Sequence, residues 1–477
     1  MTTISKSRGE VATGIALYAH LLRRAGFSAS RAQLEDYANR PYEEVVEELL
    51  NPQDKPEIDE DLLKRYYPHY GSIDNYNGAG GGRWYYRMIN SERQLQEKIA
   101  LFWHHVFATA WHKTEHSPTI IRQIELFRQN GLGKFEDILL DLSRDPAMIH
   151  WLDNNQNHSY RINENYGREL MELFSLGIGA YSEHDIKEAA RSFTGWTYRQ
   201  PMPLYPYGAW EADYSYDPDD HDDGEKTFLG HIGNFNGQDI VGIIVEEESA
   251  ARFICRHLYN FFVADEPQVP AWSIEPPQDT EAIDIMVNAY FESGHEIRSV
   301  LRTMFNSDFF KASAYQRVKS PVEFVTGVIK LSGEYTNPDP GLGELGAAST
   351  AMGQELLNPA TVEGWHTGKE WIDGGTLNER VNFAVEHVQK MDAPGVIYIS
   401  DRLAELGDSL SPEELLDGCL DLVGPLTVSD ETREGLLEFA TSIGDTNFGA
   451  GADRDAIMAN VSHMLRLIVA APEYQFG

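Results

Sequence analysis

One segment of the chain carries charged residues at helical spacing: NENYGRELMELFSL, residues 163–176. At about 100° per residue, Glu164, Arg168 and Glu172 fall within one arc of about 80° on a helix, and Glu169 lies about 60° beyond it. Carboxylates gathered in this way can hold a divalent cation or move a proton. The same spacing also gives Glu–Arg pairs at i, i+4, each of which stabilises an ordinary solvated helix by roughly 0.2–0.5 kcal/mol.

The neighbouring residues favour a polar site over a plain surface. Residues 151–165, WLDNNQNHSYRINEN, are dense in asparagine and include Asp153 and His158. A second candidate, His104, lies among apolar residues of an expected helix and should be at least partly buried. A histidine that faces glutamates from another helix is a ligand set of carboxylate-bridged metal sites in helical bundles. The alternative is a hydrogen-bonded core histidine, and the Glu-x-x-His pair of a di-metal site does not occur on the carboxylate helix.

These residues support two hypotheses of different classes. In the first, the protein is a hydrolytic or oxidative enzyme that uses a divalent metal ion (Ca, Fe, Mn or Zn). Arg168 and Glu169 are then catalytic, with Arg168 holding an anionic substrate group, and the metal ligands are His104, Glu164, Glu169 and Glu172. In the second, the protein has a non-catalytic binding or assembly role, and the Glu/Arg helix is a buried network of structural ion pairs. We expect Glu164, Arg168 and Glu172 to be largely buried and mutually paired.

An acidic loop is a separate, weaker candidate for cation binding. Between Glu211 and Asp223 the chain has seven acidic residues and no basic one. Asp217, Asp219 and Asp222 could supply oxygen ligands to Ca²⁺. The spacing is not that of an EF-hand, and a solvated acidic loop is the alternative.

Two further motifs give little support for chemistry. Residues 112–116, HKTEH, match the HxxEH pattern of inverted zinc peptidases, but Ser117-Pro118 ends the expected helix and no downstream ligand stands out. The glycine-rich residues 72–83 have no strand before them and no GK[ST] after them, so we expect a flexible connector and not a phosphate-binding loop.

The composition limits the classes of partner. The chain of 477 residues has 75 acidic and 39 basic residues, a formal net charge of −36. Nucleic acid is not an expected partner, because duplex binding needs basic residues that neutralise phosphates.

Cys255 and Cys419 are expected to be buried thiols. No apolar run reaches the roughly 18 residues that span a bilayer. The N-terminus lacks a signal-peptide pattern, so we expect a cytoplasmic protein or an exported one whose leader is removed.

Helical periodicity dominates the elements that must position these residues. We expect a mainly α protein, a large multi-helix domain with a small irregular insertion that holds one or two β-hairpins. The most apolar helix runs from about 90 to 112 and should be surrounded by protein. The predicted organisation is an N-terminal helical part with the polar site (1–194), the insertion (195–236), and a C-terminal helical part (237–477) packed on the first as one continuous domain.

Several motifs, taken together, resemble the large bacterial family catalogued as domain of unknown function 1800 (DUF1800). They occur in the family's order over residues 15–390: LLRRAGFSAS, FWHHVFAT, LDNNQN, NENYGRELMELFSLGIGAYSEHDIKEAARSFTGWTY, HDDGEKTFLG, ARFICRHLYNFFV, RVKSPVEFV and VEGWHTGKEWIDGGTLNERVNFA. The resemblance implies a predominantly helical fold, frequent export, and a sulfatase- or alkaline-phosphatase-like protein encoded nearby as a partner. It implies no settled activity. Where many relatives have histidines, this chain has Val106 and Phe174, and both differences remove potential ligands.

Overall fold

The computed structural model describes residues 13–71, 79–200 and 211–477, and helices account for most of them. The prediction of a mainly α protein is confirmed. Up to residue 194 the α-helices are α1 (Ile15–Arg24), α2 (Arg31–Ala38), α3 (Tyr42–Leu50), α4 (Asp61–Tyr66), α5 (Ala79–Asn90), α6 (Gln94–Val106), α7 (Trp111–Thr114), α8 (Ser117–Asn130), α9 (Phe135–Arg144), α10 (Pro146–Trp151), α11 (Asn165–Glu172) and α12 (Glu183–Ser192). Short 3₁₀ helices lie between them: η1 (Pro52–Asp54), η2 (Pro68–Gly71) and η3 (Asn154–Gln156).

α6 is the most deeply buried helix of this part, as its apolar residues predict. Every residue from Glu97 to Val106 is buried. The expected helix from 90 to 112 is nevertheless interrupted, because α6 ends at Val106 and α7 begins at Trp111. The backbone N–H of Trp111 donates a hydrogen bond to the carbonyl of Leu357 (3.0 Å), a tertiary contact that replaces the helical one.

The glycine-rich segment is helical where the structure describes it, so the expectation of a flexible connector over 72–83 is wrong for residues 79–83. Residues 72–78 lie outside the described ranges. Helical glycine costs conformational entropy, but here it permits close packing. A Cβ atom on Gly82 would lie 2.6 Å from the ring of Tyr70 in η2 and 3.2 Å from the backbone of Leu342 in α19 (Leu342–Ala351).

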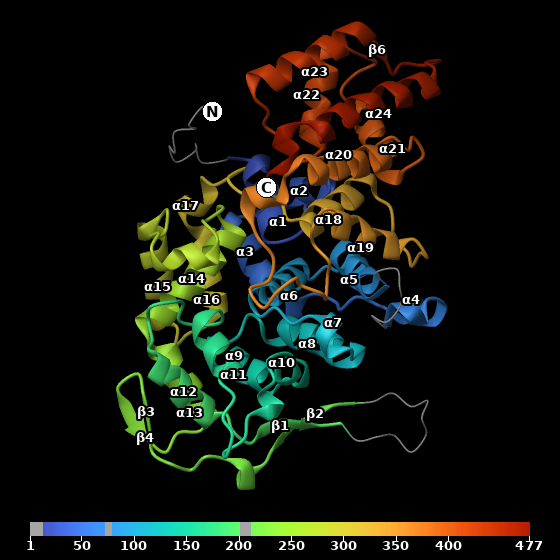
Figure 1. Cartoon of the computed structure of the whole chain (residues 1–477). Coiled ribbons are helices and arrows are strands. Elements are labelled where there is room, and N and C mark those ends of the chain that lie inside the picture. The colour runs from blue at the N-terminus through green and yellow to red at the C-terminus, as the bar shows by residue number, and fades with distance from the viewer. Residues whose placement is uncertain (1–12, 72–78, 201–210) are drawn as a thin grey trace.

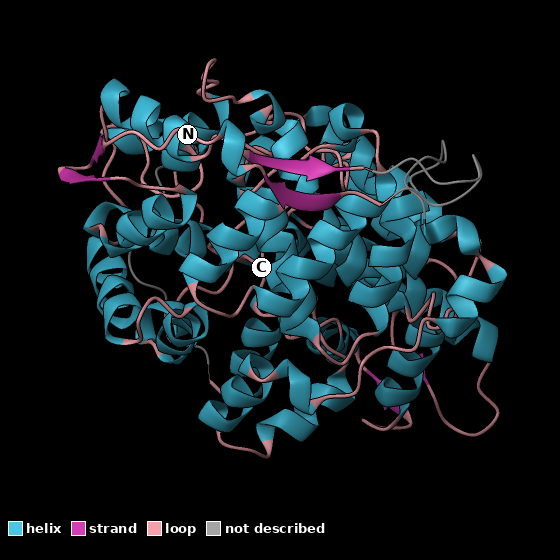
Figure 2. Ribbon diagram, turned by 90° about the horizontal axis from the view of Figure 1, so that it is seen from below, coloured by secondary structure: helices cyan, strands magenta, loops and turns pink. Residues whose placement is uncertain are grey.

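The insertion contains two β-hairpins, as predicted. β1 (Trp196–Arg199) pairs antiparallel with β2 (Asp213–Tyr216), and β3 (Lys226–Phe228) pairs antiparallel with β4 (His231–Gly233). Residues 201–210, which include Pro201, Pro203 and Pro206, lie outside the described residues. The 3₁₀ helix η4 (Pro218–Asp220) separates the hairpins. Both hairpins lie at the margin of the helical body (Figures 1 and 2).

The C-terminal part is again helical. Its α-helices are α13 (Gly237–Glu246), α14 (Glu248–Phe262), α15 (Thr280–Glu292), α16 (Ile297–Asn306), α17 (Asp308–Lys311), α18 (Pro321–Ser332), α19 (Leu342–Ala351), α20 (Gly374–Val388), α21 (Pro394–Ala404), α22 (Pro412–Leu422), α23 (Asp430–Ile443) and α24 (Arg454–Ala470). It also holds η5 (Val269–Ser273), η6 (Gly368–Trp371), η7 (Pro472–Gln475) and one more antiparallel pair, β5 (Ser409–Leu410) with β6 (Thr446–Asn447). The sequence did not predict this last pair.

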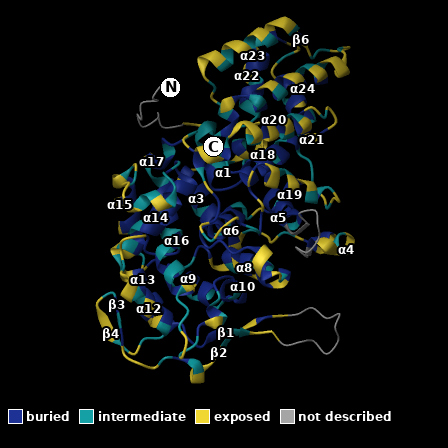
Figure 3. Cartoon of the chain, viewed as in Figure 1, coloured by how far each residue is buried: buried dark blue, intermediate teal, exposed yellow. Residues whose placement is uncertain are grey.

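The two helical parts share one hydrophobic core. A single cluster of buried apolar residues extends from Tyr18 in α1 to Tyr474 in η7. Figure 1 shows α1 and α2 beside α18 of the C-terminal part, with which they line a common cavity. Figure 3 shows that the exposed residues lie on the outer faces of the helices. The boundaries at residues 194/195 and 236/237 stay a prediction. Within the described ranges, no helix combines the length and the apolar character needed to cross a membrane.

Candidate functional site

The asparagines before α11 bond to backbone groups. Asn157 accepts a hydrogen bond from the Asn163 N–H (2.9 Å) and donates one to the carbonyl of Ala190 in α12 (2.8 Å). Asn163 accepts from the Asn165 N–H (3.0 Å) and thereby satisfies a donor at the start of α11. These side chains therefore tie α11 to α12 and fix where α11 begins.

An open polar groove of about 500 Å³ runs along this segment, between residues 156 and 164. His158 lines this groove, and its Nδ1 lies 2.5 Å from Oδ2 of Asp220 in the insertion. The other oxygen of Asp220 accepts from the Ser159 N–H (3.1 Å). The sequence pointed to the polar character of 151–165, but it did not identify Asp220 as the residue that holds the segment.

Gly167 brings α11 and α12 close together. A Cβ atom at this position would lie 3.0 Å from the backbone nitrogen of Ala190 and 3.1 Å from the carbonyl oxygen of Ile186. Any larger residue would push the two helices apart, so glycine at 167 determines how α11 presents its charged face.

Arg168 lies at the surface, which corrects the prediction that Glu164, Arg168 and Glu172 form a buried, mutually paired set. Its guanidinium donates to both carboxylate oxygens of Glu183 in α12 (3.0 and 2.8 Å), and Glu164 lies farther away at 3.6 Å. The exposed fractions of the Arg168, Glu164 and Glu183 side chains are 35%, 43% and 77%. These are solvent-screened pairs of the kind that contribute little to stability.

Glu169 and Glu172 form a separate, partly buried carboxylate pair on α11, one helical turn apart. The Tyr181 hydroxyl donates to Oε2 of Glu172 (3.0 Å). Burial raises the pKa of Glu169, and the charges of Glu172 and of Glu363, from the loop before η6, raise it further, to about 7 against an ordinary value of 4.5. The charge of Arg168 opposes this shift. We refer to Glu169, Glu172 and Tyr181 as the carboxylate site.

His104 is not brought together with these carboxylates. Its Nε2 accepts a hydrogen bond from the Leu357 N–H (3.0 Å), and its ring lies between the rings of Trp84 and Trp365, at centroid distances of 5.6 and 5.3 Å. Its buried Nδ1 has no hydrogen-bond partner in the described part of the chain. Burial, and then the charge of His105, lower the pKa of His104 to about 3, so the ring is neutral.

A metal ion does not fit His104 in this arrangement. A neutral imidazole has one lone-pair nitrogen, and here that nitrogen is Nε2, which is already bonded to a backbone N–H. Among the residues that the structure describes, no three or more His, Cys, Asp or Glu side chains are grouped so that they could hold a metal ion. The assignment of Glu164, Glu169 and Glu172 as ligands stays a prediction, without His104 as its fourth member.

The other two candidate motifs are also placed by the structure. In HKTEH, α7 ends at Thr114 and Glu115 adopts a left-handed conformation (φ 46°), so the motif is not a continuous helix.

In the acidic loop, Asp222 bonds through both oxygens to Arg191 (2.7 and 3.0 Å), which holds the pKa of Asp222 below the ordinary value. Asp217 and Asp219 are exposed. Calcium binding by this loop stays a prediction. It would require Asp222 to exchange its bonds with Arg191 for bonds to the ion.

Sequence reasoning missed a buried cluster of charges around Glu323 of α18. Arg317 pairs with Oε2 of Glu323 (2.6 Å) and Lys98 of α6 pairs with Oε1. Burial raises the pKa of Glu323, but Arg317, Lys98 and Arg24 outweigh burial and hold it well below its usual range. Lys98 lies 225 residues from Glu323 in the sequence, and only Arg317 and Glu323, both within RVKSPVEFV, could have drawn attention to the cluster.

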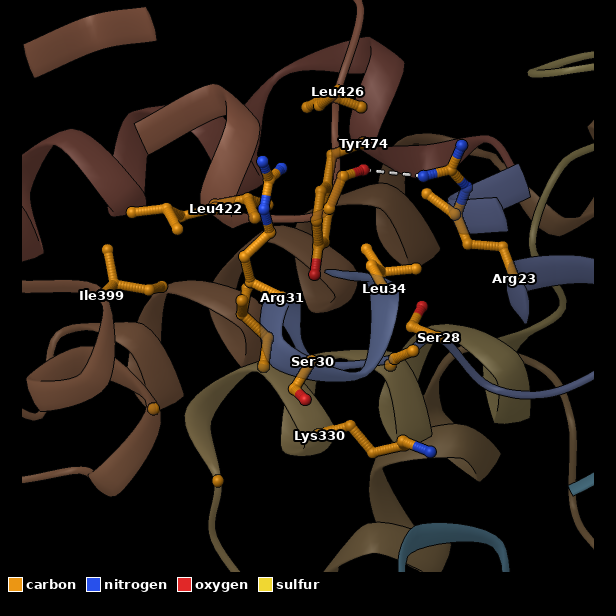
Figure 4. Close-up of a pocket in the computed structure, with 18 of the residues that line it drawn as sticks. Arg23, Ser28, Ser30, Arg31, Leu34, Lys330, Ile399, Leu422, Leu426 and Tyr474 are labelled. Atoms are coloured by element: carbon orange, nitrogen blue, oxygen red, sulfur yellow. Dashed lines mark hydrogen bonds between the residues drawn. The ribbon is translucent and has the colours of Figure 1, made fainter. Parts of the chain in front are cut away.

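Sequence reasoning also missed an apolar cavity of about 360 Å³. It lies where α1 and α2 meet α18, α21 and the end of α22, and Figure 4 shows residues that line it. Its lining contains four basic residues: Arg23, Arg31, Lys319 and Lys330. The charge pattern gave no signal here, because the basic residues come from distant segments.

Comparison with known proteins identifies the family and nothing more specific. No curated protein and no solved structure matches the chain. One family matches residues 20–476, nearly the whole chain. The match extends past residue 390, where the recognisable motifs end, and so covers the C-terminal helices as well. The chain belongs to the family described as protein of unknown function DUF1800.

Proposed function

We propose that the protein is an enzyme that uses Glu169 as its acid–base group, with Glu172 and Tyr181 beside it. The observation that carries this proposal is the position of Glu169: partly buried, one turn from Glu172 and near Glu363, so that its pKa is raised to about 7. A carboxyl group with a pKa close to neutral can both take and return a proton at physiological pH, as general acid–base catalysis requires. Groups with such shifted pKa values concentrate at functional sites.

The chemistry follows from the charges around Glu169. The ionised carboxylate would accept a proton from water or from a substrate hydroxyl, and the protonated form would then give it to a leaving group. Tyr181 stays protonated, because burial and the hydrogen bond to Glu172 raise its pKa above the usual range. The negative charge of the carboxylate site favours a neutral or cationic substrate. A hydrolytic reaction fits these roles, and no step of it uses a metal ion.

Arg168 contributes less to this proposal than the sequence suggested. Both terminal nitrogens of its guanidinium are bonded to Glu183, so an anionic substrate group would have to displace that carboxylate. We therefore keep Arg168 as a residue that lowers the pKa of Glu169, not as the principal substrate contact.

The proposal is tested by comparing the wild type with Glu169→Gln on a panel of uncharged chromogenic esters and glycosides between pH 5 and 9. Glutamine keeps the size of the side chain but cannot exchange a proton. We expect turnover that rises through about pH 7 and is lost in Glu169→Gln. Glu164→Gln, at the exposed N-cap of the same helix, is the matched control and should retain turnover.

The non-catalytic alternative, a binding or assembly role beside a sulfatase-like partner, leads to a different result. It predicts that the wild type and Glu169→Gln give the same turnover on the panel. It also predicts that the protein is recovered in a stable complex with that partner. A Glu169→Gln variant with wild-type turnover and an unchanged pH profile would contradict the acid–base role.

A further inference from the structure

The cavity between the N-terminal helices and the C-terminal part has walls that are largely apolar. α2 contributes Leu34, α18 contributes Phe324 and Leu331, α21 contributes Ile399, and Leu422 and Leu426 come from the end of α22 and the loop after it. Its volume of about 360 Å³ falls within the range of small-molecule pockets. None of its lining residues belongs to α11, so the cavity is separate from the carboxylate site.

Three basic residues of the lining have no carboxylate partner in the described part of the chain. Arg23 donates to the carbonyl of Gly424 (2.7 Å), Lys319 to the carbonyl of Tyr474 (2.7 Å), and Lys330 to the side-chain oxygen of Gln94 (2.9 Å). These acceptors are neutral and add no opposing charge. Burial holds the pKa of Lys319 well below its usual range, so Arg23 and Lys330 are the cations that a ligand would meet. The fourth basic residue, Arg31, is neutralised by Glu35 and Asp421.

The surroundings of the cavity add to the positive charge. No acidic residue is present among its described lining residues. Behind Lys319 and Phe324 lies Arg380, which is 0% exposed and donates from Nη2 to the carbonyl of Lys319 (2.8 Å). The buried Nε and Nη1 atoms of Arg380 have no hydrogen-bond partner within the described ranges. A protein with a net charge of −36 thus places Arg23, Lys330 and Arg380 around its apolar cavity, each bonded to a neutral acceptor.

The arrangement of the lining separates a polar side from an apolar side. In Figure 4, Arg23, Ser28 and Lys330 lie on one side of the cavity. Ile399 and Leu422 lie on the other side, together with Arg31, whose charge is paired with Glu35 and Asp421. Ser28 adopts a left-handed backbone conformation (φ 73°), which is strained for a residue other than glycine. The described residues offer its hydroxyl no hydrogen-bond partner, so this hydroxyl is available to a ligand beside the two cations.

We propose that this cavity binds an amphipathic anion, a single apolar chain that ends in a carboxylate or a phosphate group. The charged end would lie against Lys330, Ser28 and Arg23, and the chain would replace water along the leucine and isoleucine side chains. Burying a charge is costly unless it is paired, and an anionic head group would pair with cations that are already partly buried. The same bonding suits a carboxylate and a phosphate, so the experiment must distinguish them.

The ligand class is tested by isothermal titration calorimetry of the full chain with decanoate, decyl phosphate, decanol and decylamine, each below its micellar concentration. We expect at least one of the two anions to bind more than about tenfold more tightly than decanol, since a charge-assisted hydrogen bond contributes roughly 1.5–3 kcal/mol and about 1.4 kcal/mol is tenfold. Decylamine should not bind. A preference for one anion identifies its head group. Equal binding of decanol and both anions, or binding of none, would overturn the proposal.

Two variants and one control locate the site. Lys330→Met removes the charge and should weaken anion binding about tenfold while decanol binding stays the same. Leu34→Trp fills the cavity and should abolish binding of every probe. Arg402→Gln, a surface cation of α21 outside the cavity lining, should bind the anions as the wild type does. Unchanged anion affinity in both cavity variants would overturn the assignment to this cavity.

A second measurement does not depend on how well the variants fold. Burial lowers the pKa of Lys330 to about 8, so near pH 8.5 the amine is largely neutral in the free protein. An anion bound beside it would raise this pKa and draw in a proton. Titrations in two buffers of different ionisation enthalpy should therefore show proton uptake with the anions and none with decanol. Anion binding without proton uptake would place the ligand away from Lys330.

Discussion

The Nε2 atom of His104 accepts a hydrogen bond from the backbone N–H of Leu357, 3.0 Å away, across 253 residues of sequence. This contact fixes the ring so that the lone pair of Nε2 faces the loop that contains Leu357 and not the carboxylates of α11. It also satisfies a buried backbone donor, for which an unpaired state is costly. His104 is thus a structural residue of the core.

His104→Ala should destabilise the protein without changing its metal content. The substitution leaves a cavity between two tryptophan rings and removes the partner of the Leu357 N–H, and together these should cost about 3 kcal/mol. Urea denaturation measures the stability, and elemental analysis of the purified variant measures bound metal. A folded His104→Ala protein that has lost a metal ion present in the wild type would contradict the structural role.

Arg168→Ala should have a small effect on stability. Its ion pairs are exposed and screened by solvent, so the free energy of unfolding should change by about 0.5 kcal/mol or less. Arg317→Ala is the informative comparison, because it leaves the buried Glu323 with one of its two ion-pair partners and should cost about 3–5 kcal/mol. If urea denaturation shows equal losses for the two variants, the assignment of exposed and buried pairs is wrong.

Gly167→Ala should destabilise the contact between α11 and α12. The added Cβ would lie 3.0 Å from Ala190 N and 3.1 Å from Ile186 O, both of them backbone atoms that cannot rotate away, and forcing them apart should cost about 1–3 kcal/mol. Gly435→Ala, inside α23 with nothing within 4 Å of the new Cβ, is the matched control. It should be neutral or stabilise by about 0.5–1 kcal/mol, because alanine is the better helix former. Equal melting temperatures for the two variants would argue against close packing at residue 167.

Glu169 should make the stability of the protein depend on pH. The folded chain binds this proton more tightly (pKa about 7) than an ordinary glutamate does (4.5), so the stability from Glu169 is full below about pH 4.5 and is lost as the pH rises to 7. Glu169→Gln removes this loss, and its stability relative to the wild type should increase between pH 5 and 8. The gain should be on the order of 2 kcal/mol, since one pKa unit corresponds to about 1.4 kcal/mol and solvent screens a partly exposed group. Urea denaturation at several pH values measures this difference, and a constant difference from pH 5 to 8 would contradict the raised pKa.

The sequence was sufficient where a pattern is local. The apolar faces around Trp103 predict a buried α6, and the composition of 195–236 predicts hairpins. Local patterns could not show the break between Val106 and Trp111, after which the Trp111 N–H bonds to Leu357 of a distant segment.

The functional residues show the same limit. The charged arc of α11 was visible, but whether it is buried depends on Glu183 and Tyr181 of a later segment, which keep Arg168 at the surface and hold Glu172. Glu363 raises the pKa of Glu169 from nearly 200 residues away in the sequence. The cavity assembles Arg23, Lys319 and Lys330 only once α1 has packed against α18. Periodicity identifies the face of a helix, and long-range packing decides what that face meets.

Proton exchange by Glu169 near neutral pH, on which the proposed function rests, is tested most directly by measuring the pKa of this residue. Carbon-13 NMR of protein labelled at the glutamate side-chain carboxyl, recorded from pH 3 to 9, follows each titration, and the resonance missing from Glu169→Gln assigns the signal. The structure predicts a midpoint close to pH 7. A midpoint below about pH 5, the range of an ordinary glutamate, would contradict the account.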